Sequence, residues 1–161
     1  QILGGIGQLD ASGDAGNAII IGGIGNDDLS GGAGSDFIQG DPDGSMFFGN
    51  DTIHGGSGTD YLEGGGGADT FVFNPGEGVN TIADIELVRS NPTQTQLVGS
   101  DFQSGIDKID LSGFGFTDVN QVFDLITDVN GGTPARFSHL GTEIYFHNIS
   151  ESELTTGDFI L

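Results

Sequence analysis

The chain of 161 residues contains no cysteine, and only 3 of its residues are lysine or arginine. Without cysteine there are no disulfides, thiolate nucleophiles or cysteine-ligated metal sites. The 24 acidic residues give a formal net charge of -21 at pH 7. This charge argues against nucleic acid as a partner, because phosphate binding requires Lys and Arg. No apolar run is long enough for a transmembrane segment.

Glycine, by contrast, is abundant, with 31 residues, and it recurs at a fixed spacing. The unit is Gly-Gly-x-Gly-x-Asp-x-U-x, where U is large and apolar. Its frames begin at Gly4, Gly13, Gly22, Gly31, Gly40, Gly55 and Gly64. The first two frames are degenerate, and the frame at Gly40 holds six extra residues. Because Gln1, Ile2 and Leu3 fit the last three positions of a preceding unit, we expect the chain to be a piece of a longer protein.

Each unit predicts a tight turn followed by a very short strand. Glycine reaches the positive φ values that the turn needs, and the eighth position then points into a thin core. The eighth positions are Ala11, Ile20, Leu29, Ile38, Ile53, Leu62 and Phe71. One such side chain contributes roughly 1.5–3 kcal/mol on burial, whereas ordering nine residues costs about 1–2 kcal/mol each. The unit is therefore unstable without an added ligand.

The sixth positions indicate what that ligand is. Two stacked carboxylates ~4 Å apart repel by about 4 kcal/mol at an effective dielectric constant near 20. Ca²⁺ removes this repulsion, because it takes several carboxylate and backbone carbonyl oxygens at once. A flexible glycine linker would not keep a fixed period of nine, and a phosphate-binding loop would need a lysine that the first half lacks.

Residues Gly22–Gln39 and Gly55–Val72 resemble the nonapeptide of the repeats-in-toxin (RTX) proteins. The resemblance implies an all-β fold: a right-handed parallel β-roll followed by a β-sandwich-like C-terminal cap. It implies a roll domain over residues 1–73 and a cap over 74–161. In that family two units make one turn, alternate loops stack, and one Ca²⁺ lies between each stacked pair.

This register implies a set of calcium ligands. Asp27, Asp51 and Asp69 fall on one side of the roll, and Asp36 and Asp60 on the other. Three sites are expected, at Asp27–Asp51, Asp51–Asp69 and Asp36–Asp60. The loop carbonyls that complete them are assigned to Gly23, Gly25, Gly32, Gly34, Gly56, Gly58, Gly65 and Gly67. The degenerate turns near Leu9 and Ala18 depart from the pattern.

After Phe73 we expect the period to be lost. Strands are predicted over residues 81–85, 108–111 and 143–146, with a helix or a strand near residues 119–126 and a capping box at residues 150–153. The segment at residues 87–100 is expected to form a hairpin or loop. Asp101–Phe114 resembles the segment behind the roll in secreted RTX metalloproteases, where Asp101 and Asp107 match positions that bind a further Ca²⁺. The alternative is that both are turn and strand-end residues.

The chain ends in Asp158, Phe159, Ile160 and Leu161. An acid followed by three apolar residues resembles the C-terminal secretion signal of type I exported proteins, although a last strand has the same pattern. The resemblance implies the type I secretion apparatus as a partner, and a secreted, extracellular or cell-surface location.

Catalytic motifs are missing. His54, His139 and His147 have no zincin spacing; we expect His54 to be exposed, and His139 and His147 to form at most a surface pair. Asp41–Gly44 begins like an EF-hand loop, but Thr52 occupies the place of the required Glu.

The sequence therefore predicts a non-enzymatic calcium-binding module of a larger secreted bacterial protein, connected to upstream modules. The alternative is an extracellular polysaccharide- or surface-binding module, as in adhesins or alginate-modifying enzymes. Phe37, Tyr61, Phe47 and Phe48 are the candidate contact residues for that role. An intact enzyme is the third hypothesis.

Overall fold

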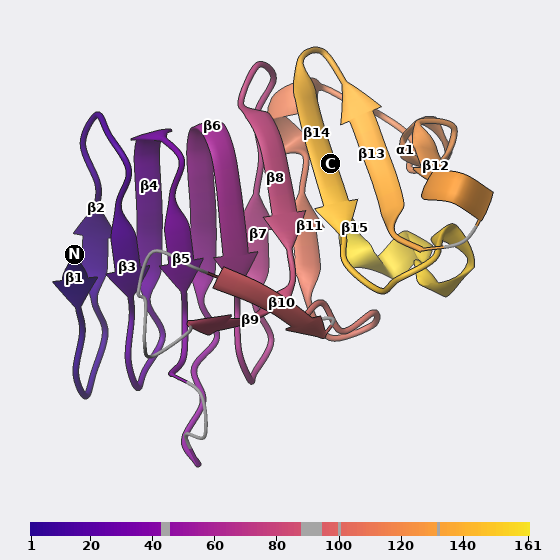
Figure 1. Ribbon diagram of the computed structural model, residues 1–161. Coiled ribbons are helices and arrows are strands. Elements are labelled where there is room, and N and C mark those ends of the chain that lie inside the picture. Colours follow the sequence, from indigo (N-terminus) through magenta and orange to yellow (C-terminus); the bar gives the residue numbers. More distant parts are fainter. Residues whose placement is uncertain (43–45, 88–94, 100, 132) are drawn as a thin grey trace.

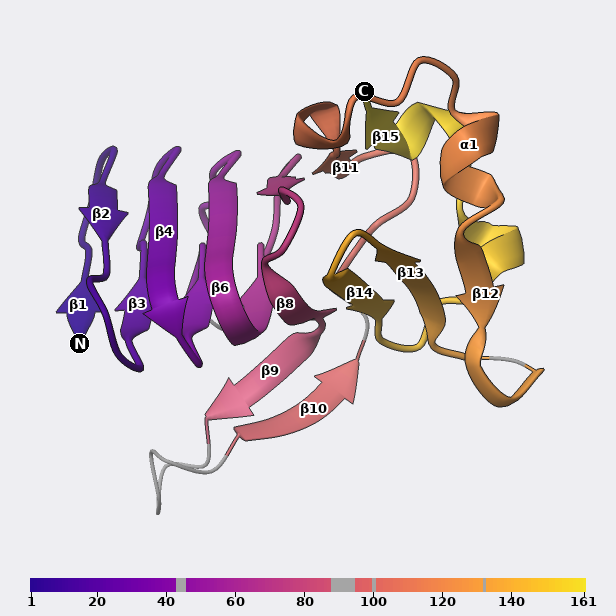
Figure 2. The ribbon, with the colours of Figure 1, turned by 90° about the horizontal axis from the view of Figure 1, so that it is seen from above.

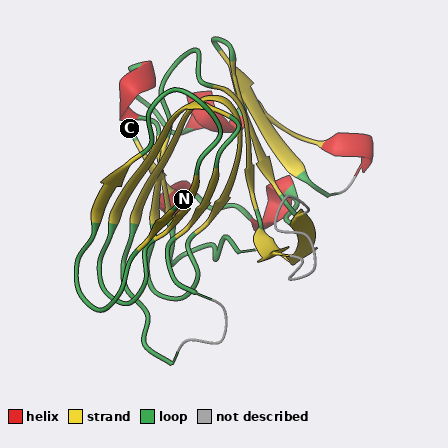
Figure 3. Cartoon of the chain, turned by 60° about the vertical axis from the view of Figure 1, so that its left-hand side comes forward, coloured by secondary structure: helices red, strands yellow, loops and turns green. Residues whose placement is uncertain are grey.

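The computed structural model describes residues 1–42, 46–87, 95–99, 101–131 and 133–161. Short parallel strands stack into two facing walls, joined by turns on both edges (Figures 1 and 2). Viewed obliquely from the N-terminal end, successive turns of the chain are nested behind one another (Figure 3). This arrangement confirms the parallel roll that the resemblance to RTX proteins implies.

Wall A contains one strand from every second repeat, followed by strands from the C-terminal part of the chain. Its order is β1 (Ile2–Leu3), β3 (Ile19–Ile21), β5 (Phe37–Gln39), the end of β6 (Thr52–Glu63), β8 (Gly78–Ile82), β14 (Thr142–Phe146), β13 (Ala135–His139) and β12 (Ile126–Asp128). The pairs from β1 to β14 are parallel, and β13 pairs antiparallel with both β14 and β12.

Wall B contains the alternate strands, and all of its pairs are parallel. Its order is β2 (Asp10–Ser12), β4 (Asp28–Gly34), the start of β6, β7 (Thr70–Val72), β11 (Lys108–Asp110) and β15 (Phe159–Ile160). Ile20 pairs with Ile38, and Leu29 with Ile53, as two units per turn require. All seven eighth-position side chains are buried, so the predicted core is confirmed.

The two walls continue beyond Phe73, where the nonapeptide period was expected to end. Ile82 aligns with Leu62 in wall A, and Ile109 aligns with Phe71 in wall B, so both walls continue into the second half of the chain. A separate β-sandwich cap is not confirmed, because β8, β11, β14 and β15 extend the walls directly. The domain boundary at residue 73 stays a prediction.

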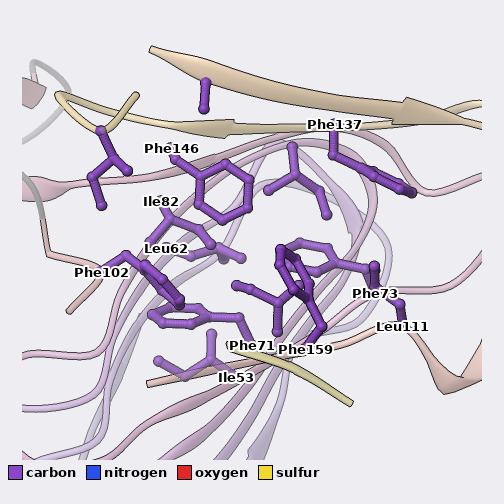
Figure 4. Packing of buried hydrophobic residues seen from close by; sticks show 14 of the residues in the cluster. Ile53, Leu62, Phe71, Phe73, Ile82, Phe102, Leu111, Phe137, Phe146 and Phe159 are labelled. Atoms are coloured by element: carbon purple, nitrogen blue, oxygen red, sulfur yellow. The ribbon is translucent and has the colours of Figure 1, made fainter. Parts of the chain in front are cut away.

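Aromatic side chains fill the C-terminal end of the roll (Figure 4). The Phe102 ring lies 6.4 Å from that of Phe71 and 5.6 Å, edge-on, from that of Phe146, measured between centroids. Phe102 is contributed by the loop before β11, and the other two by opposite walls. The cluster therefore joins wall A to wall B where the stack of repeats ends.

The remaining elements surround this end. A helix or a strand was expected near residues 119–126, and the segment contains both: helix α1 (Asn120–Phe123) is followed by β12. Val122 is the buried residue of α1. The short helices are η1 (Ser112–Phe114), η2 (Val129–Gly131), η3 (Glu151–Glu153) and η4 (Thr156–Asp158). The capping box at Ser150 and Glu153 is confirmed. Strands β9 (Asp84–Leu87) and β10 (Thr95–Gly99) form the expected hairpin, and residues 88–94 and 100 lie outside the described residues.

Candidate metal centre

The sixth positions of the repeats stack into two columns, one on each edge of the roll. The first column is Leu9, Asp27, Asp51, Asp69 and Asp107; the second is Ala18, Asp36, Asp60 and Asn80. The insertion in the frame at Gly40 does not displace Asp51, which keeps its place between Asp27 and Asp69. The alternate-loop register predicted from the sequence is therefore confirmed.

Within each column the backbone N–H of one residue donates to the Oδ1 atom of the next aspartate. In the first column the N···O distances are 2.6 Å from Leu9 to Asp27, 2.9 Å from Asp27 to Asp51 and 2.8 Å from Asp51 to Asp69. In the second column they are 2.7 Å from Ala18 to Asp36 and 3.0 Å from Asp36 to Asp60. The Oδ1 atom of each of these carboxylates therefore connects two successive turns by a hydrogen bond. We call this series of bonds the ladder.

The other oxygen of these carboxylates is buried and has no hydrogen-bond partner among the described residues. This holds for the Oδ2 atoms of Asp27, Asp36, Asp51 and Asp60, whose residues are at most 3% exposed. A buried acceptor without a partner is costly, and it calls for an unseen ligand. A cation would satisfy these oxygens, because they are negatively charged when ionised.

The first glycine of each frame marks where oxygen atoms of successive turns converge. A Cβ atom on Gly22 would overlap the Oδ2 atom of Asp27 and would also meet the carbonyl oxygen of Gly40, from the next turn. Gly31 stands in the same relation to Asp36 and Gly55, and Gly40 to Asp51 and Gly64. Carboxylate and carbonyl oxygens converge there, which is the donor set that Ca²⁺ prefers. The residues present therefore fit a calcium ion.

The eight glycines assigned as carbonyl donors share one backbone feature. Gly23, Gly25, Gly32, Gly34, Gly56, Gly58, Gly65 and Gly67 all have φ between 90° and 140°. Their role in the turns is therefore explained by a conformation that other residues rarely adopt. Their role as calcium ligands stays a prediction.

Burial changes the protonation of these carboxylates in the absence of a cation. Desolvation raises the pKa of Asp51 and Asp69 to about 7 and that of Asp60 to about 6, with smaller contributions from neighbouring acids. Desolvation also raises the pKa of Asp27. A bound cation would reverse this effect, because it stabilises the ionised form.

Asp107 and Asp101 lie at the end of the first column. Asp107 Oδ1 accepts the N–H of Asp69 at 3.0 Å, so it continues the ladder. The carboxylate of Asp101 accepts the N–H groups of Gly64 and Gly65, at 2.6 and 3.0 Å. Desolvation, and to a smaller degree Asp107 and Asp69, raise the pKa of Asp101 to about 7. The structure thus brings these acids together, and a further calcium ion there stays a prediction.

Two buried polar residues, one beside the first column and one at the end of the second, were not among the predicted site residues. Asp41 takes the place of the second glycine in its frame, is 2% exposed and has an Oδ1 atom without a hydrogen-bond partner. Asn80 is fully buried and belongs to the segment Pro75-Gly76-Glu77-Gly78-Val79-Asn80-Thr81-Ile82-Ala83. The spacing Gly-x-Gly-x-Asn-x-Ile within it was the available signal.

The histidines differ from expectation. His54, expected to be exposed, is only partly so: its side chain is 33% exposed, and its Nε2 atom lies 2.7 Å from Oε1 of Glu77. This hydrogen bond raises the pKa of His54. His139 packs against the rings of Phe114 and Phe116. It pairs with Thr142, whereas His147 follows the other end of β14, so these two histidines do not form a pair.

The C-terminal residues are ordered as a strand. Phe159 in β15 aligns with Ile109 of β11. The buried carboxylate of Asp158 accepts hydrogen bonds from Ser104 Oγ and from the N–H of Gly105, both at 2.7 Å. Burial would raise the pKa of Asp158, but these bonds and those from Thr155 outweigh it and lower the pKa.

Within the described parts of the chain, no three or more His, Cys, Asp or Glu side chains gather as a metal cluster. The sites described above instead combine one or two carboxylates with backbone carbonyl oxygens. They therefore differ from a metal site that is formed by side chains alone. No helix among the described residues is long and apolar enough to cross a bilayer.

Comparison with known proteins agrees with this geometry. The family described as RTX calcium-binding nonapeptide repeat (4 copies) matches residues 12–44 and 48–71. A solved structure similar to the chain is the AlgE6R3 subunit of the mannuronan C5-epimerase from Azotobacter vinelandii. It has 23% sequence identity and a TM-score of 0.63, with 91% of this chain and 78% of that chain covered. At this identity the likeness establishes the fold. No curated protein sequence matches the chain.

Proposed function

Since residues 12–44 and 48–71 are RTX calcium-binding nonapeptide repeats, we propose that the chain is a non-enzymatic module of a larger secreted bacterial protein. In this proposal the roll folds when Ca²⁺ binds, outside the cell, and connects to upstream modules of the same protein. The observation that carries the proposal is the set of buried, unpartnered Oδ2 atoms in the two columns. The ligands proposed are the aspartates of both columns with the loop carbonyls between them.

Charge supports the coupling between calcium and folding. Without cations the columns place buried carboxylates above one another in a chain of net charge -21. Calcium sites of the extracellular type bind at about 10⁻⁴–10⁻³ M, so they stay empty at the low calcium level of a cytosol. The chain would therefore remain unfolded inside the cell and fold after export, with metal binding and folding as one event.

The proposed export signal is Asp158, Phe159, Ile160 and Leu161, read by the type I secretion apparatus. The exposure of Ile160 and Leu161, at 40% and 38%, leaves part of this segment accessible. In the unfolded chain the whole segment would be accessible, because its pairing with β11 requires the folded wall.

The test of the proposal is a CaCl₂ titration of the chelator-treated protein, followed by far-ultraviolet circular dichroism and calorimetry. We expect a disordered roll in chelator and a cooperative gain of strand signal on calcium binding. MgCl₂ should support folding poorly, because Mg²⁺ demands stricter octahedral geometry. A fully formed roll in excess chelator, or no heat of calcium binding, would refute the proposal.

A second candidate function is binding of an extracellular polysaccharide such as mannuronan, since the similar solved structure is a subunit of a mannuronan C5-epimerase. Of the candidate aromatics, Phe37 is buried, whereas Phe47 and Phe48 are 64% and 56% exposed beside an exposed Met46. The test measures mannuronan affinity in CaCl₂ for the wild type and Phe47→Ala, with the exposed Ile6→Ala as control. No binding by the wild type would remove this candidate function, and equal affinity of all three proteins would remove Phe47 as a contact residue.

A further inference from the structure

The segment Pro75–Ala83 has the backbone course of an eighth repeat, although it lies outside the residues that match the repeat family. Strand β8 aligns Gly78 with Gly58, Asn80 with Asp60 and Ile82 with Leu62. Gly76 and Gly78 have φ values of 87° and 84°, in the region that the repeat glycines occupy. Proline replaces the first glycine and asparagine replaces the aspartate, which hides the repeat in the sequence.

Asn80 is an anomaly in this position. It is fully buried, and neither its Oδ1 nor its Nδ2 atom has a hydrogen-bond partner among the described residues. It does not act as Asp36 and Asp60 do, since those residues accept a backbone N–H from the preceding turn through Oδ1. An amide that is buried and unpaired at both atoms calls for an explanation.

The position of the Asn80 oxygen supplies one. A Cβ atom on Gly55 would lie 2.7 Å from Oδ2 of Asp60 and 2.8 Å from Oδ1 of Asn80. In the frames of Gly22, Gly31 and Gly40 the same space is lined by the frame's own aspartate Oδ2 and a glycine carbonyl of the next turn. In the last turn the side-chain oxygen of Asn80 therefore stands where a backbone carbonyl stands in the others.

We propose that Asp60 and Asn80 form an additional Ca²⁺ site at the end of the second column, beyond the Asp36–Asp60 pair. This inference rests on the proposed function, because it assigns one more site of the same kind. The ligands on this chain are the unpartnered Oδ2 of Asp60 and the Oδ1 of Asn80. An amide oxygen is an ordinary calcium ligand, and as a neutral donor it adds no repulsion to Asp60.

The alternative is that Asn80 holds a buried water molecule or turns its NH₂ group toward Asp60. These roles and the calcium role respond in opposite ways to Asn80→Asp. A second carboxylate strengthens a calcium site, whereas beside Asp60 and without a cation it adds repulsion and no donor.

The experiment uses the whole chain, freed of metal with chelator and titrated with CaCl₂ in a calorimeter, with circular dichroism to follow folding. Asn80→Ala should bind one Ca²⁺ fewer than the wild type. Asn80→Asp should keep the wild-type number, with the affinity of one site raised on the order of tenfold. The control is Asn26→Ala, which removes an exposed loop asparagine whose Oδ1 accepts the N–H of Asn50 and should leave the number unchanged.

Equal calcium numbers for Asn80→Ala and the wild type would overturn the inference and leave the proposed function intact. If Asn80→Ala does not fold in CaCl₂, Asn80→Asp decides: loss of a calcium ion or of stability in saturating CaCl₂ would also overturn it. A wild type that binds no calcium would refute the proposed function itself.

Discussion

At the scale of single residues, the aspartates are unequal because of their places in the columns. Asp51 stacks between two aspartates, Asp27 and Asp69. Asp27 stacks between Asp51 and Leu9, so it has only one acidic neighbour in the column. In the second column Asp36 is followed by Asp60 but preceded by Ala18. The number of cations that one carboxylate serves therefore depends on its neighbours in the stack rather than on its own repeat.

We expect Asp51→Ala to lose two bound calcium ions and Asp36→Ala mainly one. Each substitution also removes a ladder acceptor, from Asp27 N–H in the first case and from Ala18 N–H in the second, so the two variants are matched in that respect. Calorimetric stoichiometry in CaCl₂ measures the difference. Equal losses would contradict the assignment of Asp51 to two sites.

A second residue-scale prediction concerns the space beside the first glycines. Gly31→Ala places a methyl group against Oδ2 of Asp36 and 2.5 Å from the carbonyl of Gly55, without the cost of a positive φ. Overpacking of this kind costs about 1–3 kcal/mol, and here it also occupies cation space. We expect weaker calcium binding and a lower unfolding midpoint in urea with CaCl₂. Gly5→Ala is the control, since its Cβ meets no atom within 4 Å; equal effects of both substitutions would count against the cation space.

At the scale of elements, strand β15 combines a structural role with the proposed export role. Phe159 is 9% exposed and its ring lies edge-on, 5.5 Å from that of Phe123, while Ile160 and Leu161 are largely outside the core. Because the buried Phe159 and the partly exposed Ile160 and Leu161 belong to one short segment, substitutions at these positions can test the structural and the proposed export role separately.

We expect Phe159→Ala to destabilise the calcium-loaded protein by about 3–5 kcal/mol, as removal of a buried phenylalanine does. The double variant Ile160→Ala/Leu161→Ala should change stability by less than about 1 kcal/mol for each exposed side chain but reduce type I export. Urea unfolding in CaCl₂ and the secreted fraction are the two measurements. Normal export of the double variant would argue against its residues as part of the signal.

At the scale of the whole molecule, buried acids give the metal-free protein an unusual pH dependence. The pKa values of Asp51, Asp69 and Asp101 are raised to about 7, and that of Asp60 to about 6, above the value of about 3.9 in an unfolded chain. The folded state then binds more protons than the unfolded state, so its stability increases as the pH falls through this range.

In chelator we therefore expect the folded fraction to rise as the pH is lowered from 8 to 5. In saturating CaCl₂ the slope should reverse, because calcium requires the ionised carboxylates and protons compete with it. Circular dichroism and urea unfolding at pH 8, 6.5 and 5, each in chelator and in CaCl₂, test both pH trends. Parallel pH profiles with and without calcium would contradict the placement of these acids at cation sites.

Much of the roll could be predicted because a period of nine fixes which side chain points inward. The resemblance to RTX proteins, in which two units make one turn, then implied which repeats are neighbours. Ile20, Leu29 and Ile53 needed no more information than their positions in the repeat. The pairing of His54 with Glu77 was not predictable in this way, since it joins residues 23 apart and Glu77 lies in the segment where Asn80 replaces the aspartate. Strand β15 was likewise ambiguous, because two apolar residues do not specify a partner as distant as β11.

The ladder within the first column also gives the roll a polarity. Every bond runs from a turn to the one after it, from Leu9 to Asp27 and finally from Asp69 to Asp107, so each turn provides the template for its predecessor. The last carboxylate needs no later repeat to orient it, because Oδ2 of Asp107 accepts the N–H of Gln103 within its own loop at 2.7 Å. We therefore expect the turn that holds Asp107 to order first and the stack to order from it toward residue 1. This expected order is the reverse of the order in which a ribosome makes the chain.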